Sequence, residues 1–185
     1  MPEEFWLVLP ERIETERLVL RPWGLTDVGD VLTYARDPGW AQFLKALPIP
    51  YERKHAEEFV ARQILLDRST HPAWAIELED GAVGGINLRL NLQHRRGEIG
   101  YSIARPLWNR GYMTEAAGAV VRAAFSALPE LNRICAMADV RNTASQRVME
   151  KIGMTREGVL RQNRIERGEP IDEAWYGILR TEWRG

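Results

Sequence analysis

The chain has 185 residues, with 25 lysines and arginines against 26 aspartates and glutamates, and a formal net charge of −1. This length suits a single domain over residues 1–185, and 45% hydrophobic residues are enough to build a buried core. The balanced charge excludes the strongly basic surface of a general nucleic-acid-binding protein, so we expect no nucleic-acid partner.

The amino-terminal segment and the cysteine count bear on cellular location. Residues 1–10 lack a basic start, and their apolar run is too short for a signal peptide or a membrane span. Cys135 is the only cysteine, so no intramolecular disulfide can form, and its apolar surroundings indicate a buried structural thiol. We therefore expect a cytoplasmic protein without membrane contact. The 22 arginines against 3 lysines indicate a bacterial source with a GC-rich genome.

Local patterns predict helices and strands in the first half of the chain. Alternating apolar residues indicate strands, whereas apolar residues three and four apart after a capping residue indicate helices. The predicted elements are strands at 17–21, 73–78, 83–91 and 98–104, and helices at 26–36 and 51–67. Asp80-Gly81 predicts a tight turn between two of these strands. Asp37-Pro-Gly39 is expected to break the first helix before a connector from Trp40 to Pro50.

The second half is predicted in the same way. Its elements are helices at 111–127 and 143–151, and strands at 133–139, 159–160 and 174–179. Gly153 is expected to end the second of these helices as its C′ residue. The polar segment 161–170 is interpreted as a loop between the last two strands.

This order of elements predicts an α/β (α+β mixed) fold. Hairpins lead into a strand-helix-strand unit, which implies a mixed, mostly antiparallel central sheet with one parallel strand pair, flanked by helices. Ligands of such sheets bind where parallel neighbours part at their carboxyl ends. We therefore expect a crevice between the strands at 98–104 and 133–139.

The segment from Arg105 to Ala116 links one of those strands to the helix at 111–127. A helix start presents backbone N–H groups without internal partners, and the helix dipole places partial positive charge there. Gly111 has no Cβ, so a phosphate group can approach the main chain closely. The spacing fits neither a P-loop nor a dinucleotide fingerprint.

Four motifs in order resemble the GNAT superfamily of acetyl-CoA-dependent N-acetyltransferases, and most closely its RimJ/RimL branch, which acetylates protein N-termini. Trp108-Asn-Arg-Gly-Tyr-Met-Thr-Glu-Ala116 is similar to the pyrophosphate loop of that branch. Asn142-Thr-Ala-Ser145 and Glu150-Lys-Ile-Gly-Met154 resemble two later elements, and 13–22 resembles the first strand. The resemblance extends from about Ile13 to Trp183 and implies a GNAT-like sheet in which the parallel pair is splayed.

The resemblance implies acetyl-CoA as cosubstrate and gives a set of cofactor-binding residues. These are Ile103, Ala104, Asn109, Arg110, Gly111, Tyr112, Met113, Thr114, Asn142 and Ser145. Main-chain amides of 109–114 would face the pyrophosphate, and strand residues would pair with the pantetheine arm. Asn142 has two readings that are compatible, a hydrogen bond to pantetheine and the N-cap of the following helix.

Two residues are candidates for catalysis. Ser145 is the candidate general acid for the departing thiolate, as the resemblance implies, and it can instead simply support the first turn of its helix. Many GNAT enzymes carry a tyrosine seven residues after the asparagine, but Met149 stands there and cannot donate a proton. Glu98 is the candidate base, acting directly or through water, and the alternative is a solvated carboxylate beside a hairpin.

The partners are less constrained. We expect an amine acceptor, either a protein or peptide N-terminus, a polyamine or an antibiotic-like amine, and the resemblance implies that Trp40 in its connector and the loop at 161–170 wall the acceptor groove. No metal site is expected from the scattered histidines. A homodimer contact through residues 5–9 or the last strands remains open, as does a non-catalytic acyl-CoA-binding module on the same fold.

Overall fold

The computed structural model describes residues 9–44 and 47–184, whose strands form one sheet. The strand order is β1-β2-β3-β4-β5-β6-β8-β7. The strands are β1 (Ile13–Glu14), β2 (Val19–Arg21), β3 (Ala73–Leu78), β4 (Gly81–Asn91), β5 (Arg96–Ile103), β6 (Arg133–Asp139), β7 (Thr155–Glu166) and β8 (Glu169–Leu179). Among them, β5 and β6 pair in parallel and the other neighbours pair antiparallel, which confirms the predicted mixed sheet.

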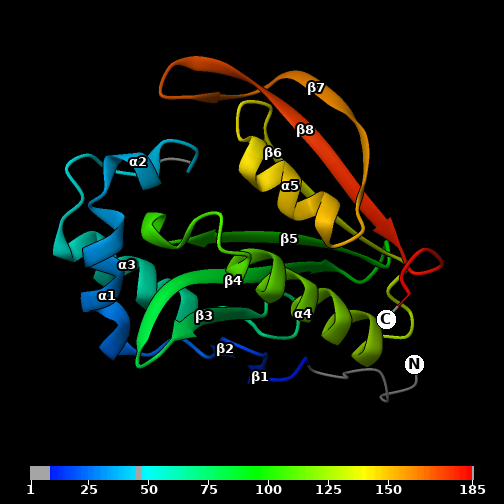
Figure 1. Cartoon of the computed structure of the whole chain (residues 1–185), viewed down its shortest axis with the longest axis horizontal. Helices are drawn as coiled ribbons and strands as arrows, with labels where there is room; N and C mark the ends of the chain where they lie inside the picture. The colour runs from blue at the N-terminus through cyan, green and yellow to red at the C-terminus, as the bar shows by residue number, and fades with distance from the viewer. Residues whose placement is uncertain (1–8, 45–46, 185) are drawn as a thin grey trace.

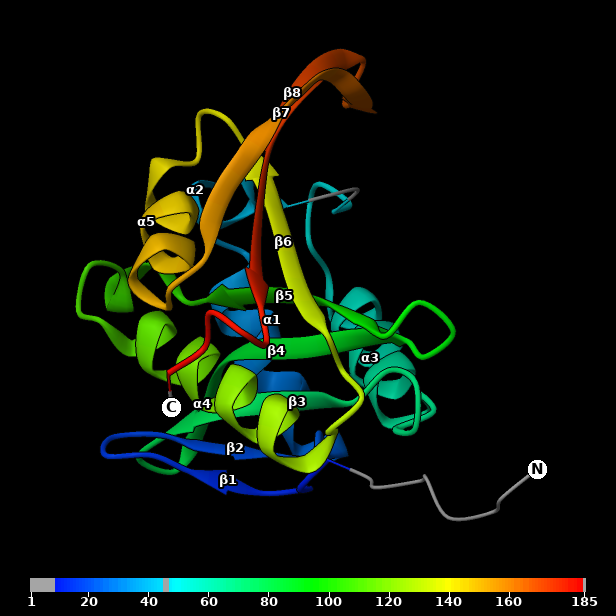
Figure 2. The ribbon, with the colours of Figure 1, turned by 90° about the vertical axis from the view of Figure 1, so that its right-hand side faces the viewer.

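Helices cover both faces of this sheet (Figures 1 and 2). The helices are α1 (Val28–Ala35), α2 (Pro38–Ala41), α3 (Arg53–Ile64), α4 (Tyr112–Ala127) and α5 (Thr143–Lys151), with short 3₁₀ turns η1 (Leu25–Asp27) and η2 (Arg105–Leu107). Alternation along β3 sends Trp74 and Ile76 into the core on the α4 and α5 side, and Ala73 and Ala75 into the core under α1 to α3. The order of elements thus yields the expected layered fold.

Helix α4 lies close against the sheet because its buried face is made of small residues. Ala116, Ala117 and Ala124 are fully buried, together with Val120 between them. Small side chains at helical spacing let the helix axis approach the strands, and burial of this stripe favours the helix over other conformations. The start of α4 is therefore fixed next to the carboxyl end of β5, where β5 leads into η2.

The end of α5 confirms the expected glycine stop. Gly153 has a φ of 89°, in the left-handed region that suits glycine. Its N–H donates to the carbonyl of Glu150, and the N–H of Met154 donates to the carbonyl of Met149. These are the two hydrogen bonds of a Schellman motif, which turns the chain from α5 into β7.

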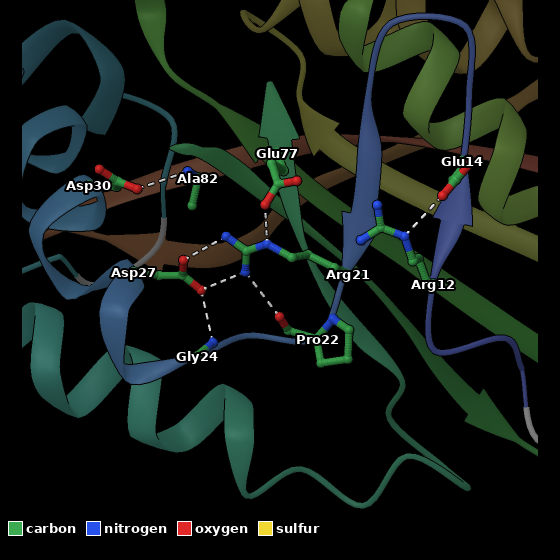
Figure 3. Close-up of polar contacts among 9 residues, drawn as sticks. All are labelled: Arg12, Glu14, Arg21, Pro22, Gly24, Asp27, Asp30, Glu77 and Ala82. Carbon is green, nitrogen blue, oxygen red and sulfur yellow. Dashed lines mark hydrogen bonds and ion pairs between the residues drawn. The ribbon is translucent and has the colours of Figure 1, made fainter. Parts of the chain in front are cut away.

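A cluster of charged residues connects the first helices to the sheet (Figure 3). The Arg21 guanidinium donates to both carboxylate oxygens of Asp27, at 2.8 and 2.9 Å, and also to Glu77. Asp27 accepts a further bond from the N–H of Gly24 at 2.8 Å. Asp30 of α1 accepts from the N–H of Ala82 in β4 at 2.8 Å. These contacts fix η1 and α1 against β2, β3 and β4.

One expectation about an irregular segment was wrong, and another was incomplete. The segment 161–170 is not a loop, because β7 and β8 form one long hairpin that turns at 167–168 and has a register shift between Leu160 and Arg164. Most of β7 is exposed, so its polar residues carry no alternating burial signal. The Asp37-Pro-Gly39 sequence ends α1 as predicted, but it also starts the short helix α2, which was not predicted: Asp37 caps α2 by accepting from the N–H of Gly39.

Two further predictions concern a dimer contact and a membrane span. Of the expected dimer segment at 5–9, residues 5–8 lie outside the described residues. None of the helices in the described part of the chain is both long and apolar enough to cross a membrane.

Candidate functional site

The parallel strands β5 and β6 separate after a short paired stretch. Their register covers only Arg96 to Glu98 on β5 and Arg133 to Cys135 on β6. Both strands continue, to Ile103 and Asp139, without pairing to each other beyond that point. We call this opening the splay. It lies where the sequence analysis placed the crevice, at the carboxyl ends of the parallel pair.

Main-chain groups of β5 face into the splay. The N–H of Ala104 donates to the carbonyl of Val83 at 2.8 Å, which fixes the phase of the β4–β5 ladder. Because hydrogen bonding alternates along an antiparallel pair, Tyr101 and Ile103 direct their main-chain groups away from β4 and toward β6. The Ile103 carbonyl accepts from the Trp108 indole at 2.8 Å. The main chain of Tyr101 thus has no strand partner on the splay side among the described residues.

A cavity of about 480 Å³ lies at the open end of the splay. Its walls comprise Trp40 and 42–44 after α1, 101–103 of β5, 107–109, 111, 113 and 114 around the start of α4, and 141–145, 147, 148 and 151 around α5. The starts of two helices therefore converge on one cavity, beside a strand edge with free main-chain groups.

The turn before α4 adopts a conformation that leaves the helix start open. Asn109 and Gly111 have φ values of 60° and 82°. Gly111 is the N-cap of α4, and no side chain caps the helix there. A Cβ built on Gly111 would find one near neighbour, Nη2 of Arg17 at 3.4 Å, so the space above the turn is otherwise open. Uncapped N–H groups beside an open glycine fit a bound phosphate group.

The start of α5 contributes Asn142. Its Oδ1 accepts from the N–H of Ser145 at 3.0 Å, so the side chain is the N-cap of α5. Within the part of the chain that the structure describes, the Asn142 Nδ2 group makes no hydrogen bond, and the residue lines the cavity. Asn142 can therefore cap α5 through Oδ1 and still donate from Nδ2 to a ligand, so the two roles expected for it are compatible.

Ser145 lies within hydrogen-bond distance of a residue that the sequence analysis did not single out as a catalytic side chain. The Tyr101 hydroxyl lies 3.1 Å from Ser145 Oγ, where either oxygen can donate, and 3.2 Å from the Ser145 carbonyl. Burial raises the pKa of Tyr101 to about 12, against the opposing effect of the Ser145 hydrogen bond. The phenol is therefore protonated at neutral pH. Met149 is 1% exposed and packs in the core, away from any donor role.

Glu98 is not brought to the cavity in this structure. It lies at the paired base of the splay, and its carboxylate accepts from Nη1 of Arg89 on β4 at 3.2 Å. The Glu98 side chain is 37% exposed and is not part of the cavity walls. Its assignment as base remains a prediction.

The expected cofactor-binding residues divide into two groups. Ile103, Asn109, Gly111, Met113, Thr114, Asn142 and Ser145 line the cavity, whereas Ala104, Arg110 and Tyr112 do not. Ala104 is hydrogen bonded to β4, and the Arg110 carbonyl accepts from Arg17 at 3.0 Å. The Tyr112 ring lies under the Arg17 guanidinium, 4.4 Å from its centroid. The last two residues thus face the β1–β2 hairpin behind the turn.

The two segments expected to wall an acceptor groove meet in the structure. Arg167, in the β7–β8 turn, donates to the carbonyl of Ala41 at the end of α2, at 3.1 Å. Figure 1 shows the tip of this hairpin near α2. Arg105 of η2 pairs with Asp37 at 2.5 Å, which joins the start of α2 to the segment after β5. These bonds link the Trp40 wall to both sides of the splay.

Other chemistry finds little support in the described residues. They contain no group of three or more histidine, cysteine, aspartate or glutamate side chains arranged to hold a metal ion. Cys135 is 3% exposed, and burial raises the pKa of its thiol. A buried thiol with a raised pKa is a poor nucleophile, in agreement with a structural role.

Comparison with known proteins agrees with this geometry. A family model described as an acetyltransferase (GNAT) domain matches residues 17–155. YnaD from Bacillus subtilis, named an uncharacterized N-acetyltransferase, is 31% identical over 172 residues, 92% of this chain and 98% of that protein. The crystal structure of a GNAT-family acetyltransferase from Bacillus anthracis is 31% identical, with a TM-score of 0.79 over 92% of this chain and 99% of that chain.

The fold is also that of RimJ from Mycobacterium smegmatis, whose structure in complex with CoA-disulfide gives a TM-score of 0.83 at 20% identity, over 95% of this chain and 90% of that chain. At this identity the likeness shows a shared fold. The chain belongs to the GNAT family and is an acetyl-CoA-dependent N-acetyltransferase.

Proposed function

We propose that this enzyme transfers the acetyl group of acetyl-CoA to the α-amine of a protein or peptide N-terminus, with the chain acting as one domain. The observation that carries the proposal is the splay, where an open helix start and a strand edge line one cavity. The pyrophosphate would bind the first N–H groups of α4 beside Gly111. The pantetheine arm would pair with the main chain of Tyr101 and Ile103, in the manner of an added strand.

The bound acetyl-CoA supplies an activated thioester next to the end of β5. The acceptor amine then attacks in a ternary complex, without an acetylated enzyme residue. The main-chain N–H groups of Tyr101 and Ile103, which face the splay, would donate to the thioester oxygen, and one such donor contributes roughly 10²–10³-fold. Asn142 Nδ2 is a second free donor at the same cavity.

Ser145 is proposed as the donor to the departing thiolate. The Tyr101 hydroxyl has one hydrogen and two acceptors, the carbonyl and Oγ of Ser145; when it donates to Oγ, the Ser145 hydroxyl hydrogen is directed elsewhere and can pass to the sulfur. The raised pKa of Tyr101 keeps its proton available at neutral pH. Tyr101 therefore acts as a positioning residue that orients the serine hydroxyl.

The acceptor must lose a proton, and the two classes of amine differ in how much help they need. A protein N-terminus has a pKa of about 7.7–8.0, whereas a lysine-like amine has a pKa of about 10.4. The carboxylate of Glu98 is paired with Arg89 outside the cavity, so its action would need a water molecule between base and amine. This arrangement favours an N-terminal amine, a sizeable fraction of which is already neutral near pH 7.5.

The acceptor groove is proposed to run between α2 and the tip of the β7–β8 hairpin. The Arg167–Ala41 bond connects these two walls, and Trp40 lies on the cavity side. An extended peptide fits such a groove because its main chain can bond with polar groups on either wall. A homodimer through the exposed strand β7 is compatible with this groove and is part of the proposal.

The experiment is a measurement of CoA-thiol release with four acceptors. They are a peptide with a free N-terminus and no lysine, the same peptide with a blocked N-terminus and one lysine, a polyamine, and an aminoglycoside. The proposal expects kcat/KM to be highest for the first peptide. A higher kcat/KM for the polyamine or the aminoglycoside would contradict the proposed acceptor while leaving acetyl transfer in place.

A further inference from the structure

Arg17 is held in one position behind the turn that leads into α4. It follows β1 and directly precedes the β2 region, 93 residues before Arg110 in the chain. Its Nη1 donates to the Arg110 carbonyl at 3.0 Å, and its guanidinium stacks over the Tyr112 ring at 4.4 Å. Arg17 thus contacts main chain and side chain of the segment 109–114, which we call the cradle loop.

Glu115 completes this contact from the first turn of α4. Its Oε2 accepts from Arg17 Nε at 2.7 Å and lies 2.6 Å from Nη2. Its Oε1 accepts from the Arg17 main-chain N–H at 2.8 Å and from Thr15 Oγ1 at 2.6 Å. Burial opposes ionisation of Glu115, but the bonds from Thr15 and Arg17 outweigh it and lower the pKa of the carboxyl. Glu115 is therefore ionised and fully engaged at neutral pH.

The cradle loop needs an external support of this kind. Asn109 and Gly111 both have positive φ values. A loop without support would adopt this left-handed conformation at both residues only part of the time. No side chain caps α4 at Gly111. The Arg110 carbonyl lies between the two left-handed residues, so the bond from Arg17 fixes the orientation of the intervening peptide groups. Nε and Nη2 of the same guanidinium converge on Glu115 Oε2 while Nη1 bonds to the Arg110 carbonyl, a planar arrangement of donors that lysine cannot reproduce.

We propose that Arg17 is a positioning residue for acetyl-CoA, which acts from behind the cradle loop by holding its N–H groups toward the pyrophosphate. Arg17 and Glu115 belong to separate motifs, at 13–22 and 108–116, and this contact joins the two motifs in the fold. The inference rests on the proposed binding of the pyrophosphate at Gly111. Arg17 itself is not among the cavity walls, so its action is indirect.

The test compares two acetyl donors in three proteins. The donors are acetyl-CoA and acetyl-pantetheine, which lacks the pyrophosphate. The proteins are the wild type, Arg17→Gln, and the matched control Arg12→Gln, whose exposed ion pair with Glu14 lies on the same hairpin. We expect Arg17→Gln to raise KM for acetyl-CoA about tenfold, equivalent to about 1.4 kcal/mol, with kcat within about twofold. The kcat/KM for acetyl-pantetheine should stay unchanged, as should all constants of Arg12→Gln.

A purely structural role for Arg17 would lower the rate with both donors equally, and that result would overturn the proposal. So would an unchanged KM for acetyl-CoA in Arg17→Gln. Arg17→Lys provides a second check that retains the charge and the fold. It should resemble Arg17→Gln, because lysine cannot bond to Glu115 and the Arg110 carbonyl together. A wild-type KM for acetyl-CoA in Arg17→Lys would show that the positive charge alone is sufficient, and would reject the positioning role of Arg17.

Gly111→Ala distinguishes the pyrophosphate site from the positioning role of Arg17. If it raises KM for acetyl-CoA while Arg17→Gln does not, the cradle is correct and the positioning role is wrong. If neither variant changes KM for acetyl-CoA, the proposed pyrophosphate site itself is wrong.

Discussion

The charged cluster around Arg21 and the splay differ in whether their polar groups have hydrogen-bond partners within the protein. In the cluster, Asp27 is 2% exposed, and its carboxylate accepts from Arg21 and from the main chain of Gly24 (Figure 3). In the splay, the open end of β5 and the start of α4 have main-chain groups that no strand or capping side chain of the described residues satisfies. The cluster is complete without a ligand, whereas the splay becomes complete only with one.

This difference separates stability from function along the sheet. Substitutions in the cluster should change the free energy of unfolding and leave donor binding intact. Substitutions in the splay should act mainly on donor binding or catalysis and have smaller effects on the free energy of unfolding, because groups that bind a ligand are not fully used by the fold. The following experiments test this separation.

Asp27→Ala should have the largest effect. It leaves the Arg21 guanidinium without its main partner in a mostly buried position, since the Arg21 side chain is 20% exposed. We expect a loss of about 3 kcal/mol in the free energy of unfolding, measured by urea denaturation. Glu14→Ala, which breaks an exposed ion pair on the first hairpin, should cost less than about 1 kcal/mol. An equal loss in both variants would contradict the role of burial.

Ser145→Ala should lower kcat about 100-fold, with little change in KM for acetyl-CoA or in the free energy of unfolding. Tyr101→Phe should lower kcat less, because water can orient the Ser145 hydroxyl in its place. Single-turnover rates of acetyl transfer measure the chemical step directly. Ser126→Ala, on the exposed side of α4, is the matched control. Full activity in Ser145→Ala would show that Ser145 is not the general acid and that water or another group protonates the thiolate.

Gly111→Ala and Gly168→Ala form a pair with the same backbone strain. Their φ values are 82° and 84°, so alanine should destabilise both proteins by about 1 kcal/mol. A Cβ added to Gly168, in the β7–β8 turn, would meet nothing within 4 Å beyond the adjacent residues. Only Gly111→Ala should weaken acetyl-CoA binding, by about tenfold in calorimetry, since the strain at Gly111 and the contact of the new Cβ with Arg17 would shift the N–H groups of the cradle loop. Equal affinities in the two variants would remove Gly111 from the site.

The smallest effect concerns pH. The Arg141 side chain lowers the pKa of Asp139 at the wide end of the splay, mainly through hydrogen bonds. A lowered folded-state pKa contributes stability that is present above the unfolded value of about 3.9 and is lost as pH falls through the lower folded value. Asp139→Asn should therefore lose less stability than the wild type between about pH 5 and pH 2. Parallel pH curves of unfolding free energy would show that the pair contributes nothing.

The sequence predicted elements whose signals are local. Strand β6 at 133–139 and helix α5 at 143–151 have the expected bounds, because apolar runs and a glycine stop mark them directly. The predicted strands at 159–160 and 174–179 cover only part of β7 and β8, because β7 is exposed along most of its length and no face of it needs apolar residues. The helix α2 spans only 4 residues, too few for a periodic signal.

The candidate site was predictable only in part for a related reason. Gly111, Asn142 and Ser145 lie at helix starts, where motif and capping chemistry coincide in the sequence. The Tyr101–Ser145 contact joins residues 44 apart, and the Arg17–Glu115 contact joins residues 98 apart. Neither pair shares a helix or a strand, so only the folded sheet brings them together. The same folding directs Glu98 to Arg89 and away from the cavity, which its position on β5 alone did not reveal.

The most direct test of the account is a crystal structure of the enzyme with coenzyme A. We expect the pyrophosphate oxygens to accept hydrogen bonds from main-chain N–H groups between Gly111 and Thr114, and the pantetheine arm to lie along Tyr101 and Ile103 in the splay. A pyrophosphate held elsewhere, or bound only by side chains with the start of α4 left empty, would contradict the central claim.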